Sequence, residues 1–259
     1  DVLWPAALFF IIWGLVQGMR GQNILPTQHA HLLIFGVCGL VGLWFMRRPA
    51  RFALGIAAIL LATRGYAGSF GDFLFTERSF FGVYRGMRDG ENKFHFIFHG
   101  TTLHGVQSLD PTGRLKPLSY YHPTGPAGQV FHALSAMGFD KPVAIVGLGA
   151  GALACYGKAG QAFDFYEIDP LVERIARDAN LFTFMRDCPA RTSVHIGDAR
   201  VTLARAPQSS YGMFILDAFS GDSIPIHLLT REAVELYLTK LLPEGLLLFH
   251  VSNRYMDLT

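Results

Sequence analysis

The stretch that decides the fold is Val143-Ala144-Ile145-Val146-Gly147-Leu148-Gly149-Ala150-Gly151, and a helical pattern begins directly after it at Ala152. Four consecutive apolar residues are typical of a parallel strand that is buried on both faces. The glycines Gly147, Gly149 and Gly151 let the chain turn sharply and approach a ligand beside the start of a helix. The stretch therefore predicts the first strand–loop–helix unit of a nucleotide-binding α/β fold.

The second strand of this unit ends in acids. Ala162–Asp169 reads AFDFYEID, and Glu167 follows Gly147 by twenty residues. At about that offset, a carboxylate at the end of the second strand accepts hydrogen bonds from ribose hydroxyls. Pro170 then takes the first position of a helix, where proline is tolerated. These residues predict a site for the ribose of a nucleoside cofactor.

Three more strands and a helix continue the pattern. Asp198 follows the first of these strands, and Asp217 follows the second. Alternating strands and helices predict a doubly wound parallel sheet. The expected elements cover residues 193–196, 213–216, 231–240 (the helix) and 246–251.

Acids at successive strand ends predict one shared ligand site. Ligands of parallel sheets bind at the carboxyl ends of the strands, so Glu167, Asp198 and Asp217 are expected to meet there. Asp198 can accept a hydrogen bond from an adenine amino group, and the glycine loop lacks the sixth-position glycine of the usual NAD pattern. Both features favour an adenosyl cofactor of the S-adenosylmethionine type over NAD.

The first 63 residues hold most of the apolar excess of a chain that is 51% hydrophobic. Val2–Met19 and His29–Met46 each carry no charge over eighteen residues, which is long enough to predict a transmembrane helical hairpin. Two buried core helices are the alternative. The basic cluster Arg47–Arg51 predicts a cytoplasmic side for the chain after it. Phe52–Thr63 is short for a span and fits an interfacial or re-entrant helix, although a crossing there would place the rest of the chain on the opposite side.

These patterns predict three regions. Residues 1–70 form the transmembrane and interfacial region, 71–125 a small N-terminal β domain, and 126–259 a Rossmann-like catalytic domain. The net charge of +2 gives no bulk electrostatic reason to expect a nucleic-acid partner. The three cysteines form no CxxC pair, and we expect reduced structural thiols.

From Thr76 onward the sequence resembles the spermidine synthase family of aminopropyltransferases, and most closely its membrane-fused bacterial branch. The matching stretches are Glu77–Val83, His99–Gln107, Tyr120–Pro123, the Gly147 loop, Tyr166–Pro170, Gly197–Arg200, Asp217–Pro225 and His250–Tyr255. The resemblance implies a class I S-adenosylmethionine-dependent transferase sheet behind a small β domain. It also implies two more strands beyond the fifth, which we expect in a continuation of the chain.

Site residues are implied by the same resemblance. It implies a cofactor site at Gln107, Gly147, Gly149, Gly151, Glu167, Asp169, Asp198 and Ala199, and a catalytic site at Tyr121, His122, Asp217 and Asp222. Asp217 matches the acid that handles the attacking amine. An alkylammonium must lose a proton before its nitrogen can attack the carbon beside a sulfonium, and a carboxylate within reach can take that proton. No metal is expected.

Three departures from the family pattern lie at the reactive end of the site. Ala150 stands where the family has an acid, Pro123 follows the Tyr-His pair in place of glutamate, and Asp217 and Asp222 are five residues apart instead of three. The expected reaction is transfer of an aminopropyl group from decarboxylated S-adenosylmethionine to a polyamine such as putrescine, releasing 5′-methylthioadenosine. The alternatives are a methyltransferase or lyase that uses intact S-adenosylmethionine, and a non-catalytic adenosyl-binding membrane protein.

The expected location is the inner (cytoplasmic) membrane, with several crossings and the catalytic domain facing the cytoplasm, where adenosyl cofactors are made. Membrane lipid and the polyamine substrate are the expected partners, and a homo-oligomer is compatible with the sequence.

Overall fold

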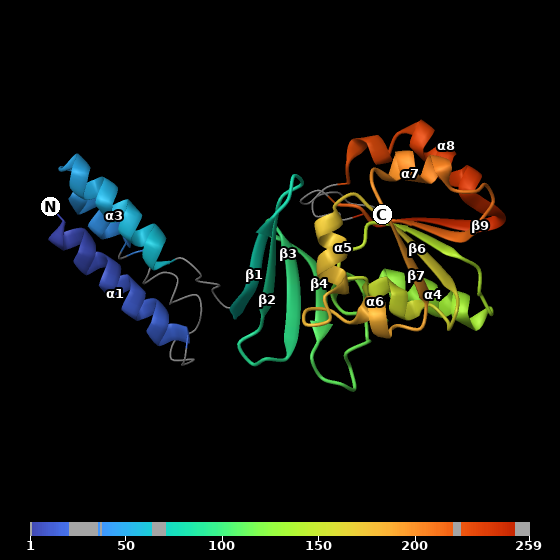
Figure 1. Cartoon of the computed structure of the whole chain (residues 1–259), viewed down its shortest axis with the longest axis horizontal. Coiled ribbons are helices and arrows are strands. Elements are labelled where there is room, and N and C mark those ends of the chain that lie inside the picture. Colours follow the sequence, from blue (N-terminus) through green and yellow to red (C-terminus); the bar gives the residue numbers. More distant parts are fainter. Residues whose placement is uncertain (1, 21–35, 37, 64–70, 220–223, 252–259) are drawn as a thin grey trace, which may run out of the picture. The chain divides into compact units, whose positions relative to one another are not determined.

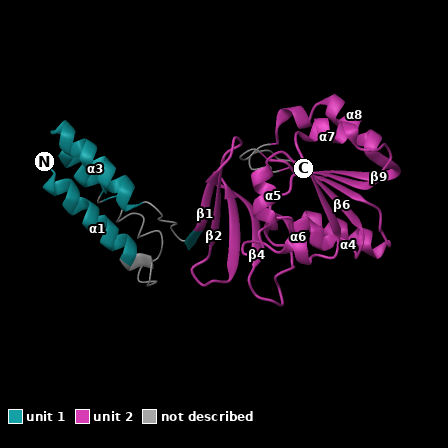
Figure 2. Cartoon of the chain, viewed as in Figure 1, with its two compact units in different colours: residues 1–73 teal, residues 74–259 magenta. Residues whose placement is uncertain are grey.

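The structure is a computed structural model of the whole chain, and it describes residues 2–20, 36, 38–63, 71–219 and 224–251 (Figure 1). The chain divides into two compact units, Asp1–Phe73 and Leu74–Thr259 (Figure 2).

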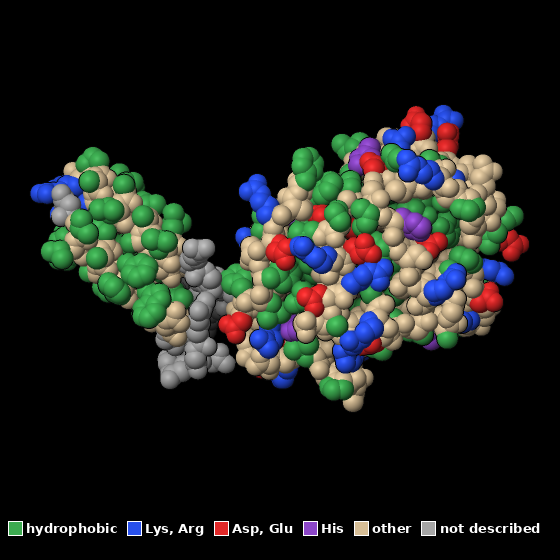
Figure 3. Space-filling model, in the orientation of Figure 1, with side chains coloured by type: hydrophobic (Ala, Val, Ile, Leu, Met, Phe, Trp, Pro, Cys, Tyr) green, Lys and Arg blue, Asp and Glu red, His purple; other side chains and the backbone are tan. Residues whose placement is uncertain are grey.

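Unit 1 is helical. Helix α1 covers Leu3–Arg20 and α3 covers Pro49–Ala62, and residues 36 and 38–45 are also helical. The helices pack through a small cluster of buried side chains, namely Leu8, Ile12, Val16, Cys38, Phe45 and Ala62. Apolar side chains dominate the face of this unit that Figure 3 shows, whereas acidic and basic side chains intermingle on the visible face of unit 2.

The predicted transmembrane hairpin is wrong for the part of the chain that the structure describes. No helix there combines the length with the sustained apolar character that a membrane crossing requires. Helix α3 has 14 residues, which at a rise of 1.5 Å span about 21 Å, against a hydrocarbon core of about 30 Å. A count of uncharged residues does not show where each helix ends. The multi-pass inner-membrane location rested on that hairpin and is corrected with it. Residues 29–35 and 37 of the second expected span, 29–46, lie outside the described residues.

The first sheet of the chain has four strands in the order β1-β2-β3-β4, and all but the first two residues of β1 belong to unit 2. Its strands are β1 (Asp72–Arg78), β2 (Val83–Arg88), β3 (Phe94–His99) and β4 (Thr102–Ser108). The β2–β3 and β3–β4 pairs are antiparallel. Strand β1 was not expected from the sequence.

The second sheet is entirely parallel, with the order β7-β6-β5-β8-β9. Its strands are β5 (Val143–Val146), β6 (Ala162–Glu167), β7 (Arg191–Ile196), β8 (Tyr211–Leu216) and β9 (Leu241–Phe249). The predicted Rossmann-like α/β fold is therefore confirmed. Strand order reverses around β5, so the crevice where ligands bind in such sheets lies at the carboxyl end of this strand.

Helices cover both faces of the parallel sheet. Figure 1 shows α7 (Ala199–Arg205) and α8 (Arg231–Lys240) on one face, with α4 (Pro126–Ala136) and α6 (Phe184–Asp187) on the other. Alternate residues of β5 divide between two buried clusters: Val143 and Ile145 point to one, Ala144 and Val146 to the other. Complete burial of both faces explains why this strand is continuously apolar.

Three short elements lead into the site. The 3-10 helix η2 covers Ser119–Tyr121, η3 covers Ala152–Tyr156 and η4 covers Ile226–Leu228. Helix α5 covers Pro170–Arg177 and starts at the proline, as predicted.

Cys155 of η3 and Cys188, directly after α6, form a disulfide, whereas Cys38 is a buried free thiol. The expectation of reduced thiols is therefore wrong for the first two. The bond joins the segment that follows the glycine loop to the segment that precedes β7.

Candidate active site

A pocket of about 580 Å³ opens where β5, β6 and β8 end, and we call it the strand-end pocket. Its volume lies within the range usual for small-molecule sites. Gly147, Glu167 and Asp217 line it from the three strand ends. The opposite wall comes from the antiparallel sheet and the loops beside it.

The glycine loop needs its glycines. Gly147 has a φ of +100° and Gly149 a φ of +54°, and both line the pocket. A Cβ on Gly147 would lie 2.9 Å from the carbonyl carbon of Asp217, and a Cβ on Gly149 would lie 2.7 Å from the carbonyl oxygen of His104. Gly151, which has a φ of +82°, belongs to the same loop but does not line the pocket.

Glu167 holds this loop from the end of β6. Its Oε2 accepts a hydrogen bond from the Leu148 N–H at 3.0 Å, and its Oε1 accepts one from the Asp169 N–H at 3.0 Å. The side chain is 8% exposed, and this burial raises the pKa of its carboxyl group. A carboxylate offers about four acceptor positions, so acceptor capacity remains for a hydroxyl of a ligand.

Asp169 lies behind the pocket wall. It is 1% exposed and does not line the strand-end pocket. Its Oδ1 accepts from the Leu171 N–H at 2.9 Å and so caps α5, while its Oδ2 accepts from the Ser79 hydroxyl. Burial, followed by the nearby Asp169 charge, raises the pKa of Tyr84. Asp169 thus links the end of β6 to the antiparallel sheet, which is a supporting position.

On the other side of Glu167, Asp198 caps α7 by accepting from the Arg200 N–H at 2.8 Å. Its Oδ2 also lies 3.3 Å from Nε2 of His227. Ala199 and His227 line the pocket, whereas Asp198 stands just outside the lining.

Gln107 is not brought together with these residues. It is 2% exposed, its Nε2 donates to Thr183 Oγ1 at 2.9 Å and to the Arg114 carbonyl at 3.0 Å, and its Oε1 accepts from the Thr183 N–H at 2.9 Å. It lines a separate cavity of about 130 Å³ that also includes His95. The expected role in the nucleoside pocket stays a prediction.

Asp217 is the centre of the reactive end. Its side chain is 6% exposed. Its Oδ2 accepts from the Tyr121 hydroxyl, and its Oδ1 lies 2.6 Å from Nδ1 of His250. The hydrogen bond to Asp217 raises the pKa of His250 despite partial burial of the ring. Burial, reinforced by the Asp217 charge, holds the pKa of Tyr121 well above its ordinary value.

The other two predicted catalytic residues are not in this cluster as described. The Nδ1 atom of His122 lies 2.8 Å from the Oγ1 atom of Thr124, and His122 does not line the pocket. Asp222 lies outside the described residues.

Four histidines line the pocket that the sequence did not single out: His99, His104, His227 and His250. His250 had a detectable signal, because it follows β9 just as Asp217 follows β8. Adjacent parallel strands place such residues side by side. The backbone N–H of His250 donates to the Leu216 carbonyl at 2.9 Å, which fixes that adjacency.

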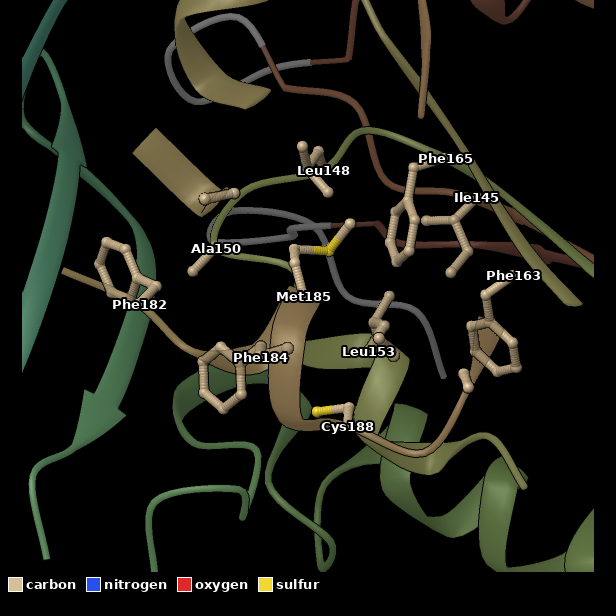
Figure 4. Close-up of a cluster of buried hydrophobic side chains, with 14 of the residues drawn as sticks. Ile145, Leu148, Ala150, Leu153, Phe163, Phe165, Phe182, Phe184, Met185 and Cys188 are labelled. Carbon is tan, nitrogen blue, oxygen red and sulfur yellow. The ribbon is translucent and has the colours of Figure 1, made fainter. Parts of the chain in front are cut away.

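Ala150 is packed into the protein. It is 2% exposed, and Figure 4 shows it among buried side chains that include Phe182, Phe184 and Met185. A Cβ on Gly105 of β4 would lie 2.6 Å from the Ala150 Cβ, so this position faces the antiparallel sheet.

Among the described residues, Glu167 and Asp217 are the acids that line the pocket. Within the same ranges there is no cluster of three or more potential metal ligands.

The fold of unit 2 is shared with a solved structure. A probable spermidine synthase from Corynebacterium glutamicum ATCC 13032 shares the fold with a TM-score of 0.54; the two are 19% identical, and the match covers 67% of this chain and 62% of that one. No model of a known protein family matches the chain.

The sequence itself is similar to a curated relative over part of its length. The polyamine aminopropyltransferase of Vibrio vulnificus (strain CMCP6) is 40% identical over 97 residues, which cover 35% of this chain and 30% of the relative. The resemblance to the spermidine synthase family is thereby confirmed for this stretch, which spans less than a third of the relative's length. The comparisons do not bear on a membrane-fused branch.

Proposed function

We propose that unit 2 is an aminopropyltransferase that moves the aminopropyl group of decarboxylated S-adenosylmethionine to an amine such as putrescine and releases 5′-methylthioadenosine. The observation that carries the proposal is the pairing of two acids in one pocket. Glu167 stands at the ribose end and Asp217 at the reactive end, on the two strands that flank β5.

The residues present fit an adenosyl substrate. Gly147 and Gly149 present bare backbone to the pocket, and Glu167 keeps acceptor capacity for ribose hydroxyls. Aromatic rings at the wall, including Tyr84, Tyr120 and Phe219, suit a sulfonium or ammonium cation, which is attracted to ring faces. Because the sulfonium is already activated, positioning of the amine and removal of its proton are the main tasks left to the protein.

Ala150 favours a second candidate, an enzyme that uses intact S-adenosylmethionine, such as a methyltransferase or a lyase. The family's acid at this place would hold the aminopropyl ammonium, and Ala150 offers no charge and is turned into the core. Nothing at this position therefore selects the decarboxylated form.

One assay separates the two candidates. The purified full chain is incubated with putrescine and either decarboxylated or intact S-adenosylmethionine, and the nucleoside product is identified by mass spectrometry. 5′-Methylthioadenosine formed only from the decarboxylated donor, and only with amine present, supports the aminopropyltransferase. S-adenosylhomocysteine, or 5′-methylthioadenosine formed without an amine, supports the second candidate and refutes the first.

A variant tests the reactive end of the pocket. Asp217→Asn removes the charge at the reactive end but leaves the ribose end unchanged. We expect turnover to be lost while the affinity for 5′-methylthioadenosine stays within about twofold. An equal loss of both would contradict a role at the reactive end.

A further inference from the structure

We propose that His250 is the group that takes the proton from the attacking amine, and that Asp217 and Tyr121 position it. This inference rests on the proposed aminopropyl transfer and deepens it. The family resemblance assigns the proton to Asp217 directly, whereas the geometry points to the imidazole one hydrogen bond further into the pocket.

The surroundings of Asp217 support this assignment. Both carboxylate oxygens already accept a hydrogen bond, Oδ2 from the Tyr121 hydroxyl and Oδ1 from His250, and the side chain is 6% exposed. Little of the carboxylate is left for an incoming ammonium. A buried acid that holds an imidazole through Nδ1 is, however, the arrangement that orients a histidine base in hydrolytic triads.

His250 has the access that Asp217 lacks. Its side chain is 29% exposed and lines the strand-end pocket, between the rings of Tyr120 and Phe219 at centroid distances of 5.6 and 4.9 Å. With the Nδ1 proton donated to Asp217, the lone pair of the imidazole resides on Nε2. Among the described residues, no hydrogen bond engages that nitrogen.

The groups around the ring set its acidity. Asp217 faces it from the end of β8 and Tyr120 faces it from η2, while Tyr121 donates to the same Asp217 carboxylate. Asp217 raises the pKa of His250, which brings the base closer to that of an amine and increases the driving force for proton transfer. The neutral imidazole is the active form, so turnover is expected to rise with pH through a pKa above the ordinary 6.5.

The proton and the electron pairs balance in this step. Nε2 of His250 takes one proton from the substrate ammonium and becomes an imidazolium paired with Asp217. The freed amine nitrogen forms a bond to the methylene carbon beside the sulfonium, the carbon–sulfur bond breaks, and its electron pair stays on sulfur as a neutral thioether. The positive charge of the sulfonium passes to the new secondary ammonium, and His250 returns its proton to solvent.

His250→Asn is the decisive variant, because the asparagine amide can still donate to Asp217 but cannot accept a proton. His132→Asn, at an exposed position on α4, is the matched control. With putrescine and decarboxylated S-adenosylmethionine, we expect His250→Asn to lower kcat by about 10²- to 10⁴-fold and to lose the acid limb of the pH profile, while the control stays at the wild-type rate.

A second amine substrate distinguishes a catalytic base from a residue that only supports the structure. A fluorinated monoamine that is unprotonated at pH 8 needs no base, so the defect of His250→Asn should shrink to below about tenfold with it. If His250→Asn keeps the wild-type kcat and pH profile with putrescine, or if its defect is equally large with both amines, the proposal is overturned. The wild-type chain is assayed first, and if it turns over neither amine the proposed function itself has failed.

Discussion

Gly147→Ala tests how the glycine loop packs against the end of β8. The φ of +100° at Gly147 is strained for any residue with a Cβ, at a cost on the order of 1–3 kcal/mol. The new Cβ would also lie 2.9 Å from the carbonyl carbon of Asp217 and closer still to its oxygen. These are backbone atoms that move only with the strand, and overpacking of this kind costs about 1–3 kcal/mol more. We therefore expect the free energy of unfolding to fall by roughly 2–6 kcal/mol.

Gly138→Ala is the matched control for the strain alone. Gly138 has a φ of +78°, and a Cβ there would meet nothing within 4 Å. Its loss should stay within about 1–3 kcal/mol, and its turnover should be unchanged, whereas the Gly147 variant should lose turnover because Asp217 is displaced. Urea unfolding is followed by circular dichroism, because Trp4, Trp13 and Trp44 all lie in unit 1. Equal midpoints and slopes for the two variants would refute the packing argument.

Two further predictions concern pH and redox state. Burial raises the pKa of Glu167 above its ordinary 4.5, so the affinity for 5′-methylthioadenosine should be full at neutral pH and fall as pH drops through the raised value. Calorimetry between pH 8 and 4.5 can show this, and a constant affinity over that range would contradict the ribose role. Reducing the Cys155–Cys188 disulfide, which closes a sequence separation of 33, should lower the free energy of unfolding by about 3–4 kcal/mol, and urea midpoints that do not change with dithiothreitol would refute this.

Local signals predicted much of the parallel sheet. The strand Val143–Val146 and the helix Arg231–Lys240 have the bounds that the sequence predicted. Continuous apolar runs and helix caps depend on residues that are close in the sequence, so they can be recognised locally. Thr230 caps the latter helix by accepting from the Ala233 N–H at 3.3 Å. Strand β9 was expected to begin at residue 246 but begins at Leu241. The pairing with β8 is irregular there, and only the tertiary partner explains it.

The unit 1 prediction failed for a related reason. Absence of charge over Val2–Met19 and His29–Met46 indicates burial of apolar side chains, but it does not say what buries them. Part of the apolar surface is covered by helix packing within the unit, as at Leu8, Ile12 and Phe45.

The candidate site residues also differ in how far local sequence predicts them. Glu167 and Asp217 were predictable because each ends a strand that the sequence identifies, and parallel sheets gather strand ends. His250 was missed because its role depends on β9 lying next to β8, a pairing that the sequence does not state. Gln107 matches a family motif, yet its amide donates hydrogen bonds to Thr183 and to the Arg114 carbonyl. Thr183 is 76 residues away in the sequence, so local patterns do not reveal this contact.

Strand order also sets the distance over which the proposed reaction is arranged. Glu167 ends β6 and Asp217 follows β8, and these strands flank β5 on opposite sides. Two strand spacings of about 4.8 Å separate them by roughly 10 Å. That span must hold the ribose, the thioether sulfur, the reacting methylene carbon and the amine nitrogen. In the proposed reaction, a ligand held by Glu167 at one end presents its sulfonium near Asp217 and His250. The reversal of strand order at β5 thus brings the proposed ribose-binding acid and the acid that positions the proposed base to one pocket.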